Sequence, residues 1–246
     1  YFIAIYLTRN ALRPIEITWN NQAKFIQDAS HELRTPITIV SSKLEGILKH
    51  PNNTINDEVE YIADAMNETR RLKKMINDLL TLTKEDYVEV IQKEEVDLEA
   101  LIKDLCDDFF DIAMIQNKTL KVSLNLKHKN IMSDKNKLRQ LFVIFLDNAF
   151  KYTEEEDYIK VSLNEKDEKI VVKIEDNGFG IKKEEISHLF DRFFRSENVI
   201  NKDIDGSGIG LSIAKVICDS LKYKLEVDSE YGKWTEFKII IPIDID

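Results

Sequence analysis

Residues 25–37 have the sequence FIQDASHELRTPI, in which His31 stands between a serine and a glutamate, five residues before Pro36. From about Pro14 to Leu48, apolar residues recur at spacings of three and four, the pattern of a helix that buries one face. This stripe consists of Phe25, Ala29, Leu33, Ile37, Val40, Leu44 and Ile47. With roughly 100° of rotation per residue, His31 points about 200° away from the stripe. We therefore expect its imidazole to be exposed.

The neighbours of His31 suit a nucleophilic role for its imidazole, a ring whose neutral form is nucleophilic. Glu32 can take a proton from the ring as the other ring nitrogen attacks, and Thr35 follows one helical turn later on the same face. Pro36 should bend or loosen the helix here, because it removes a backbone donor and crowds the carbonyl group of Glu32. A zinc-protease motif is excluded, since Thr35 stands where a second histidine is needed. Taken alone, the stretch is also compatible with a surface histidine beside a chance proline.

Length and composition restrict the classes of protein to which the chain can belong. Its 246 residues are enough for two domains. The net charge of −10 argues against nucleic acid as a partner, because nucleic-acid-binding proteins usually present a basic face. Cys106 and Cys218 lie in apolar stretches without metal-ligand spacing, so neither a disulfide framework nor a zinc site is expected.

A second helical pattern follows the first. The stretch KHPNNTIND (49–57) interrupts the first helix with a proline and several polar residues. The apolar stripe of the second run comprises Val59, Ile62, Met66, Thr69, Leu72 or Lys73, Ile76, Leu79 and Thr83. Two antiparallel helices cannot hide both stripes alone, so we expect a four-helix bundle formed by two chains.

The remainder of the chain alternates between helical and strand patterns. Residues 97–117 and 134–152 and the residues after GSGIGLS have helical patterns, whereas TLKVSLNL, KLEVDS and EFKIIIP are typical of strands. YIKVSLNE and KIVVKIED alternate with a period of two around the turn KDE, which predicts a hairpin. This order predicts a two-layer α+β sandwich, a sheet with helices on one face.

Three polar residues cluster near the end of the apolar helix, in FLDNAFKYT (145–153). The amide oxygen of Asn148 is a suitable hard ligand for Mg²⁺. Lys151 can neutralise phosphate charge, and Tyr152 can flank a base or a ribose. Helix ends commonly carry such residues, so this stretch alone is a weak signal.

Two glycine-rich stretches follow, EDNGFGI (175–181) and DGSGIGLS (205–212). Their glycines are Gly178, Gly180, Gly206, Gly208 and Gly210. Asp176, at the end of a predicted strand, could accept a hydrogen bond from an adenine amino group while the adjacent glycines let the backbone approach the ring. The second stretch opens a helix, whose free N–H groups can hold phosphate. It lacks the lysine of a P-loop and the strand order of a dinucleotide-binding fold.

These motifs, in this order, resemble those of sensor histidine kinases of two-component systems. FIQDASHELRTPI resembles their H box, and the stretches at 145–153, 175–181 and 205–212 resemble the N, G1 and G2 boxes. Those three boxes mark the Bergerat, or GHKL, ATP-binding fold that histidine kinases share with gyrase and Hsp90. HLFDRFFR (188–195) resembles the F box, and the polar stretch SENVINKDID (196–205) would be the lid over ATP. The resemblance covers nearly everything from Phe25 onward.

The resemblance implies ATP and Mg²⁺ as ligands and a role for each motif. His31 would be the phosphoacceptor and Glu32 its general base, while Thr35 would orient the water that removes phosphate from the partner regulator. Asn148 would be the metal ligand. The nucleotide would be held by Asn148, Lys151, Tyr152, Asp176, Gly178, Gly180, Arg192, Arg195, Gly206, Gly208, Gly210 and Leu211.

The resemblance also implies the organisation and partners of the chain. We expect a dimerisation and phosphotransfer domain at 25–86, a charged linker at 87–96 and a catalytic ATP-binding domain at 97–246. Residues 1–9 are apolar up to Leu7 and are followed by arginines. A spanning helix needs roughly 20 apolar residues. Residues 1–9 are therefore expected to be either a short terminus or the end of a membrane helix on its cytoplasmic side, with a helical connection at 10–24. The implied partners are a second copy of the chain and the receiver domain of a response regulator.

Two positions depart from the family pattern. Ile144 stands where many members carry a first asparagine, four residues before Asn148, so that metal binding rests more on Asn148. Trp234 replaces a glycine that is usual in the last box, and we expect it to pack on the sheet. The expected activity is autophosphorylation of His31 and phosphotransfer, with regulator phosphatase activity in addition. The alternatives are an enzyme biased to phosphatase action and a signalling scaffold with a vestigial nucleotide site.

Overall fold

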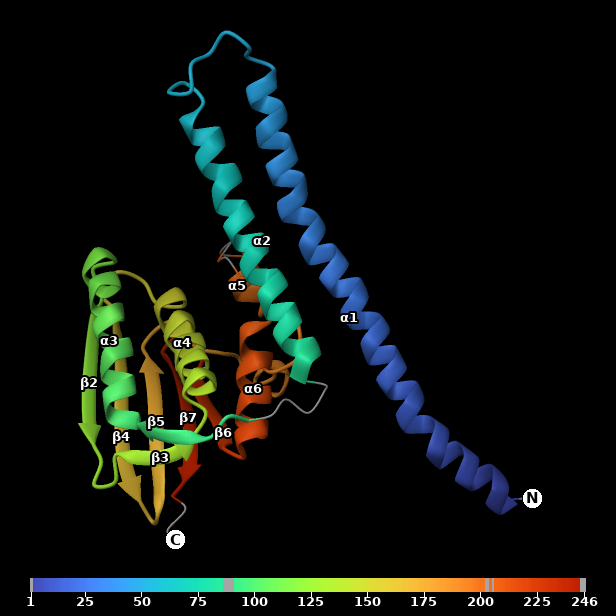
Figure 1. The fold of residues 1–246 in the computed structure, drawn as a ribbon, viewed down its shortest axis with the longest axis vertical. Helices are drawn as coiled ribbons and strands as arrows, with labels where there is room; N and C mark the ends of the chain where they lie inside the picture. Colours follow the sequence, from blue (N-terminus) through green and yellow to red (C-terminus); the bar gives the residue numbers. More distant parts are fainter. Residues whose placement is uncertain (1, 86–90, 202–203, 205, 244–246) are drawn as a thin grey trace. The chain divides into compact units, whose positions relative to one another are not determined.

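The structure is a computed structural model that describes residues 2–85, 91–201, 204 and 206–243. The chain divides into two compact units, residues 1–80 and 81–246. The first is helical and the second contains the sheet (Figure 1).

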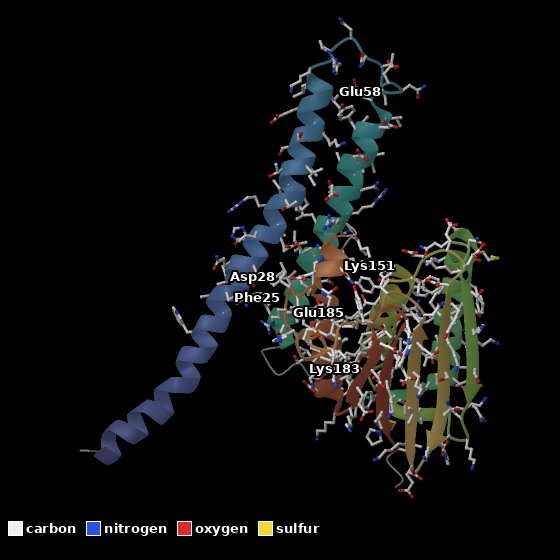
Figure 2. All side chains as sticks on the ribbon, turned by 180° about the vertical axis from the view of Figure 1, so that it is seen from behind. Phe25, Asp28, Glu58, Lys151, Lys183 and Glu185 are labelled. Atoms are coloured by element: carbon white, nitrogen blue, oxygen red, sulfur yellow. The ribbon has the colours of Figure 1, made fainter. Side chains whose placement is uncertain are left out.

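The helical unit is an antiparallel hairpin of α1 (Phe2–Leu48) and α2 (Val59–Glu85). The connecting turn is fixed by its own polar side chains: the Asp57 carboxylate accepts hydrogen bonds at 2.8 Å from both the backbone N–H and the hydroxyl group of Thr54. These bonds lower the pKa of Asp57. Glu58, labelled in Figure 2, accepts a bond of 2.6 Å from the side chain of Asn53.

The register of the hairpin is set close to this turn. Lys43 of α1 forms an ion pair of 2.6 Å with Asp64 of α2. Gly46 faces the ring of Tyr61 so closely that an added Cβ atom would lie 2.9 Å from a ring carbon. α1 begins well before Pro14 and continues as a helix through Pro36, so the expected disturbance does not interrupt it.

Several residues of the predicted apolar stripes are exposed in the single chain. On α1, Ile37 is 51% exposed and Leu44 is 49% exposed. On α2, Val59 is 56% exposed, Met66 51% and Ile76 43%. One hairpin therefore leaves part of each stripe exposed and the rest half-buried, in agreement with the expectation that two helices alone cannot hide both stripes.

The second unit is a two-layer α+β sandwich, as predicted. Its elements are β1 (Glu94–Asp97), α3 (Leu98–Ile115), β2 (Thr119–Asn125), β3 (Asn130–Ser133), α4 (Lys135–Lys151), β4 (Tyr158–Lys166), β5 (Lys169–Asp176), a 3₁₀ turn (Ile186–His188), α5 (Glu197–Asn201), α6 (Gly210–Leu221), β6 (Lys224–Glu230) and β7 (Trp234–Pro242). The main sheet has the order β2-β4-β5-β7-β6, with β2 and β4 parallel and the other pairs antiparallel. α3, α4 and α6 cover one face of it (Figure 1).

The core lies between the sheet and these helices. Every second residue of β5 is buried, including Ile170, Val172 and Ile174. Facing them, α4 buries Leu141 and Phe145. The ring centroid of Phe145 lies 4.8 Å from that of Phe237 in β7. The alternation that predicted the β4–β5 hairpin is therefore the alternation between core and solvent.

Part of the expected linker at 87–96 is a strand. Residues 86–90 lie outside the described residues, but Glu94–Asp97 pairs antiparallel with Asn130–Ser133 in a separate two-stranded sheet. In the expected lid, Glu197–Asn201 forms α5, and residues 202, 203 and 205 lie outside the described part of the chain. Of the predicted membrane-proximal stretch, Tyr1 is not described. Within the described residues, no helix has the length and apolar character that crossing a membrane requires.

Candidate functional site

The phosphoacceptor motif occupies the middle of α1. His31 and Thr35 are exposed, as the stripe pattern predicted, and Glu32 is half-buried. Residues four apart in a helix lie on one face, so His31 and Thr35 present their side chains to the same side of α1. The arrangement can offer an imidazole nucleophile to a reactant from solvent, with a carboxylate next to it in sequence.

The N box forms the last turns of α4. The carbonyl oxygen of Asn148 accepts a hydrogen bond of 3.0 Å from the N–H of Tyr152, the residue that ends the helix. The side-chain amide nitrogen of Asn148 is buried and has no hydrogen-bond partner among the described residues. Leaving a buried donor without a partner is costly. The observation fits a side chain that is completed by a ligand, and its amide oxygen is of the kind that Mg²⁺ binds.

The N box is joined to the G1 box through main-chain atoms. The carbonyl oxygen of Tyr152 accepts a hydrogen bond of 3.1 Å from the N–H of Phe179. A Cβ atom on Gly178 would lie 2.0 Å from the same oxygen, so a side chain cannot be accommodated there. Glycine at 178 is thus required by the close approach of two main-chain segments, whereas the sequence had suggested glycine here for an approach to a nucleotide ring.

Asp176 is the buried acid of the site. It ends β5, is only 4% exposed, and its Oδ1 atom accepts a hydrogen bond of 3.0 Å from the N–H of Gly178. Burial raises its pKa from the ordinary 3.8 to about 7, although the bond from Gly178 opposes this. A strongly perturbed carboxyl group among glycines is typical of a functional site. Its second oxygen can accept a hydrogen bond from a ligand.

The G2 box approaches the end of α4. Gly206 has φ +153, and a Cβ atom there would lie 2.1 Å from the Nζ atom of Lys151. Lys151, labelled in Figure 2, places its ammonium group 5.1 Å from the ring centroid of Tyr152. The predicted phosphate-neutralising lysine therefore lies against the predicted phosphate loop.

The G2 box also contacts the F box. Gly208 has φ +70, and its carbonyl oxygen accepts a hydrogen bond of 3.0 Å from the N–H of Phe193. Arg195, a predicted phosphate contact, donates a hydrogen bond of 2.6 Å to the carbonyl oxygen of Ile204, near the end of the expected lid. Its Nε atom is buried without a hydrogen-bond partner among the described residues. Arg192, the other candidate, is half-buried.

The helix α6 begins after an apolar N-cap residue. Ile209, its N-cap residue, makes no capping hydrogen bond with its side chain. Helix N-termini leave their first N–H groups without helical partners, and such groups bind phosphate. Gly210 and Leu211 begin this helix and are both half-buried. A Cβ atom on Gly210 would lie 3.5 Å from the side chain of Ile144. Ile144, which departs from the family pattern, therefore lies next to the G2 box.

The G1 box rests on the turn between β6 and β7. A Cβ atom on Gly180, where φ is +60, would lie 2.1 Å from the carbonyl oxygen of Glu230. The N–H of Gly232 donates a hydrogen bond of 2.7 Å to the carbonyl oxygen of Phe179. Trp234 follows this turn as the first residue of β7 and is half-buried opposite Glu230.

Asn177 is a supporting residue that the sequence did not single out. Its Oδ1 atom accepts a bond of 2.6 Å from the N–H of Tyr158, and its Nδ2 atom donates to Asp157 at 2.9 Å. These bonds fix the end of β5 against the start of β4. The partners lie about twenty residues earlier, and no local pattern connects them.

The structure thus brings together the N, G1, F and G2 boxes in the second unit. It places His31, Glu32 and Thr35 in the first unit. One unit carries a site suited to a purine nucleotide with its phosphates, and the other carries an exposed nucleophile.

Two family models match the chain. The His Kinase A (phospho-acceptor) domain matches residues 21–87, and the histidine kinase-, DNA gyrase B-, and HSP90-like ATPase matches residues 133–245. Sensor protein CiaH of Streptococcus pneumoniae is 33% identical over 240 residues, 98% of this chain and 54% of that protein. Signal transduction histidine-protein kinase ArlS of Staphylococcus epidermidis is 33% identical over 230 residues, 93% of this chain and 50% of that protein. The chain spans about half the length of the curated relatives it matches.

Solved structures have the same fold. The Acinetobacter baumannii histidine kinase AdeS superimposes with a TM-score of 0.71 at 25% identity, covering 87% of this chain and 98% of that one. Histidine kinase ThkA, in a crystal structure with the response regulator protein TrrA, gives a TM-score of 0.76 at 22% identity, covering 96% of this chain and 66% of that one. The second similarity concerns the fold alone.

Proposed function

Because the chain belongs to the sensor histidine kinases of two-component systems, we propose that it transfers the γ-phosphoryl group of ATP to His31 and then to an aspartate of a response regulator. The observation that carries this proposal is the convergence of the four boxes beside the buried carboxyl group of Asp176. A vestigial site would not be expected to keep a buried acid whose pKa is raised to about 7.

In the first step, a ring nitrogen of His31 attacks the γ-phosphorus. A P–N bond forms, the bond between the γ-phosphorus and the bridging oxygen breaks, and ADP leaves. The proton of the attacking imidazole passes to Glu32, which is adjacent and half-buried. Catalysis of phosphoryl transfer is largely positioning and charge neutralisation. Both come here from the ATP-binding unit.

The residues of that unit fit ATP with Mg²⁺. The carboxylate of Asp176 accepts a hydrogen bond from the adenine amino group. Gly178 and Gly180 let the backbone lie close to the adenine ring, and Tyr152 flanks the nucleoside. The N–H groups at Gly206, Gly208, Gly210 and Leu211 hold the phosphates, together with Lys151 and Arg192. Asn148 is the protein ligand for Mg²⁺, which neutralises charge on the phosphate oxygens when bound. Arg195 is the second candidate for a phosphate contact, and it also binds the carbonyl oxygen of Ile204.

In the second step, an aspartate of a receiver domain takes the phosphoryl group from His31. Membership of the histidine kinases supports a partner of this kind, and ThkA, which shares the fold, was crystallised with a response regulator protein. We further propose that Thr35, exposed one turn after His31, orients a water molecule that removes phosphate from that regulator. Kinase and phosphatase activities would then share one face of α1.

The domain limits proposed from the sequence stand as part of this account: 25–86 for dimerisation and phosphotransfer, 87–96 for the connection and 97–246 for ATP binding. Exposed apolar residues on both helices of the hairpin support a dimer that buries them in a four-helix bundle. We also propose that residues 1–9 end a membrane helix and that 10–24 connect it to the hairpin on the cytoplasmic side. The arginines at 9 and 13 and the continuity of α1 support this.

The proposal is tested by incubating the chain with ATP labelled at the γ-phosphate and Mg²⁺. We expect label on the protein that is stable in alkali, labile in acid and absent from His31→Gln. Nucleotide binding without label would favour the phosphatase-biased enzyme or the scaffold. To separate these two, dephosphorylation of the regulator is measured with the unaltered chain and with Thr35→Ala. If the unaltered chain dephosphorylates the regulator and the variant does not, the chain is a phosphatase.

A further inference from the structure

Lys118 makes an unusual pair of contacts outside the boxes. It lies in the connection between α3 and β2 and is half-buried. Its Nζ atom donates hydrogen bonds to the carbonyl oxygen of Phe150 at 2.5 Å and to that of Thr153 at 3.0 Å. Phe150 lies in the last turn of α4, which carries the N box, and Thr153 follows its C-cap residue, Tyr152.

These contacts complete the carboxyl end of α4. The last four carbonyl groups of a helix have no helical partners, and a buried helix end needs substitutes. The carbonyl of Asn148 is bound by the N–H of Tyr152, and that of Ala149 by the Thr153 hydroxyl at 2.8 Å. Lys118 supplies the ammonium group for Phe150. A cation at this end also interacts favourably with the helix dipole.

The position of Lys118 is not that of an ordinary surface lysine. Burial lowers its pKa, and the nearby carboxylate of Asp157 partly opposes this effect. The chain thus buries part of an ammonium group where it can bond main-chain carbonyl groups. Hydrogen bonds from a charged donor are among the strongest in proteins.

The two carbonyl groups that Lys118 holds flank the residues of the nucleotide site. Between Phe150 and Thr153 stand Lys151, against Gly206, and Tyr152, whose carbonyl oxygen binds Phe179. A shift of this helix end would therefore displace a phosphate-binding side chain and the junction with the G1 box together.

We propose that Lys118 is a positioning residue of the nucleotide site: by binding the carbonyl groups of Phe150 and Thr153, it fixes Lys151 and Tyr152 for ATP. The inference rests on the proposed function and assigns Lys118 no contact with the nucleotide. The two hydrogen bonds of Lys118 end at Phe150 and Thr153 and not at Asn148, the proposed metal ligand. The effect is therefore on ATP affinity, whereas the reaction at saturating ATP is retained.

The test compares Lys118→Met in the full chain with the control Lys121→Met. Lys121 lies three residues later on β2, where its ammonium group lies over the ring of Tyr158 at 4.8 Å and not at α4. We expect Lys118→Met to weaken binding of a fluorescent ADP analogue and to raise the KM for ATP by about tenfold or more. The labelling rate at saturating ATP should stay within about twofold of that of the unaltered chain, because the substitution weakens binding of ATP equally in the ground state and in the transition state. Lys118→Arg, which keeps charge and donors, should recover most of the affinity.

Equal affinity of Lys118→Met and the unaltered chain would overturn the inference, as would a loss of rate without a change in KM. If Lys118→Met does not fold at the assay temperature, Lys118→Gln takes its place and must show the same rise in KM. Failure of the unaltered chain to bind the analogue would instead contradict the proposed function. The two failures are thus distinguishable.

Discussion

The carbonyl oxygen of Tyr152 accepts a hydrogen bond of 3.1 Å from the N–H of Phe179. This bond joins the end of α4 to the loop after β5, two segments with separate sequence motifs. Gly178 permits it, because any side chain there would occupy the position of the Tyr152 carbonyl group. The nucleotide site therefore depends on main-chain packing as much as on its polar side chains.

Gly178→Ala is expected to lower the free energy of unfolding by about 2–4 kcal/mol, through overpacking and loss of this bond. The matched control is Gly210→Ala, where the added Cβ atom makes an ordinary contact of 3.5 Å with Ile144 at the start of α6. There we expect a gain of about 0.4–1 kcal/mol, because alanine restricts the unfolded chain. Chemical denaturation of both variants measures the difference. Equal stabilities would show that the approach at Gly178 is not tight in solution.

Asp176→Asn is expected to weaken ATP binding roughly 10- to 100-fold, the value of a hydrogen bond to a charged group. For the unaltered chain, affinity should rise as the pH increases through about 7, because a protonated carboxyl oxygen opposes the adenine amino donor. Calorimetric titration between pH 6 and pH 8 measures both effects. A variant with the same pH profile as the unaltered chain would contradict the role of Asp176.

Asp176→Asn, which is expected to weaken ATP binding, is expected to raise the free energy of unfolding. The folded-state pKa of Asp176 is raised from 3.8 to about 7, so its stabilising contribution is lost as the pH rises through that interval. Asp176→Asn removes this loss and keeps an oxygen that can accept the bond from Gly178. We expect the variant to be more stable than the unaltered chain by a few kcal/mol above pH 7, with no such gain near pH 4. Denaturation curves at the two pH values test the sign.

Asn148→Ala separates function from stability in a different way. The buried amide nitrogen of Asn148 has no hydrogen-bond partner among the described residues, so its removal should change the free energy of unfolding by less than about 1 kcal/mol. Autophosphorylation in Mg²⁺ should nevertheless fall by at least about 100-fold, since the proposed metal ligand is lost.

The control for this variant is Asn177→Ala. The side-chain amide of Asn177, unlike that of Asn148, has hydrogen-bond partners for both its oxygen and its nitrogen, Tyr158 and Asp157. It should destabilise the fold by about 1–3 kcal/mol. Comparable destabilisation by both substitutions would mean that Asn148 is a structural residue.

The exposed apolar residues of the hairpin predict a dimer. Leu44→Lys combined with Met66→Lys would place charges at two positions that are each about half exposed in the single chain. Burying an unpaired charge at the interface is costly, so the double variant should be monomeric in light scattering at concentrations where the unaltered chain is a dimer. Glu45→Lys, a charge change at an exposed position of α1, should leave the dimer intact. A dimer of the double variant would place the interface elsewhere.

The sequence predicted those elements whose patterns are local. The β4–β5 hairpin was evident because apolar residues alternate on both sides of a polar turn, and in the structure those residues are the core. β1 was missed: Glu94–Asp97 has three charged residues and one buried apolar residue, Val96. It is a strand only because Asn130–Ser133, far away in sequence, pairs with it.

The candidate site was predictable in its motifs and not in its supports. Asp176 and the glycines lie in short stretches whose composition indicates their role. Lys118 has no such context, because its acceptors follow more than thirty residues later. The bond from Arg195 to Ile204 could not be inferred either, since a charged side chain in the F box is equally compatible with phosphate.

The central claim is that His31 receives the phosphoryl group. Trypsin cleaves after Lys24 and Arg34, which gives the peptide FIQDASHELR with one histidine and one serine. After incubation with ATP and Mg²⁺, mass spectrometry at neutral to alkaline pH should locate phosphate on His31 of this peptide, and acid treatment should remove it. An unmodified His31 in chain that has bound ATP, or phosphate on Ser30, would contradict the account.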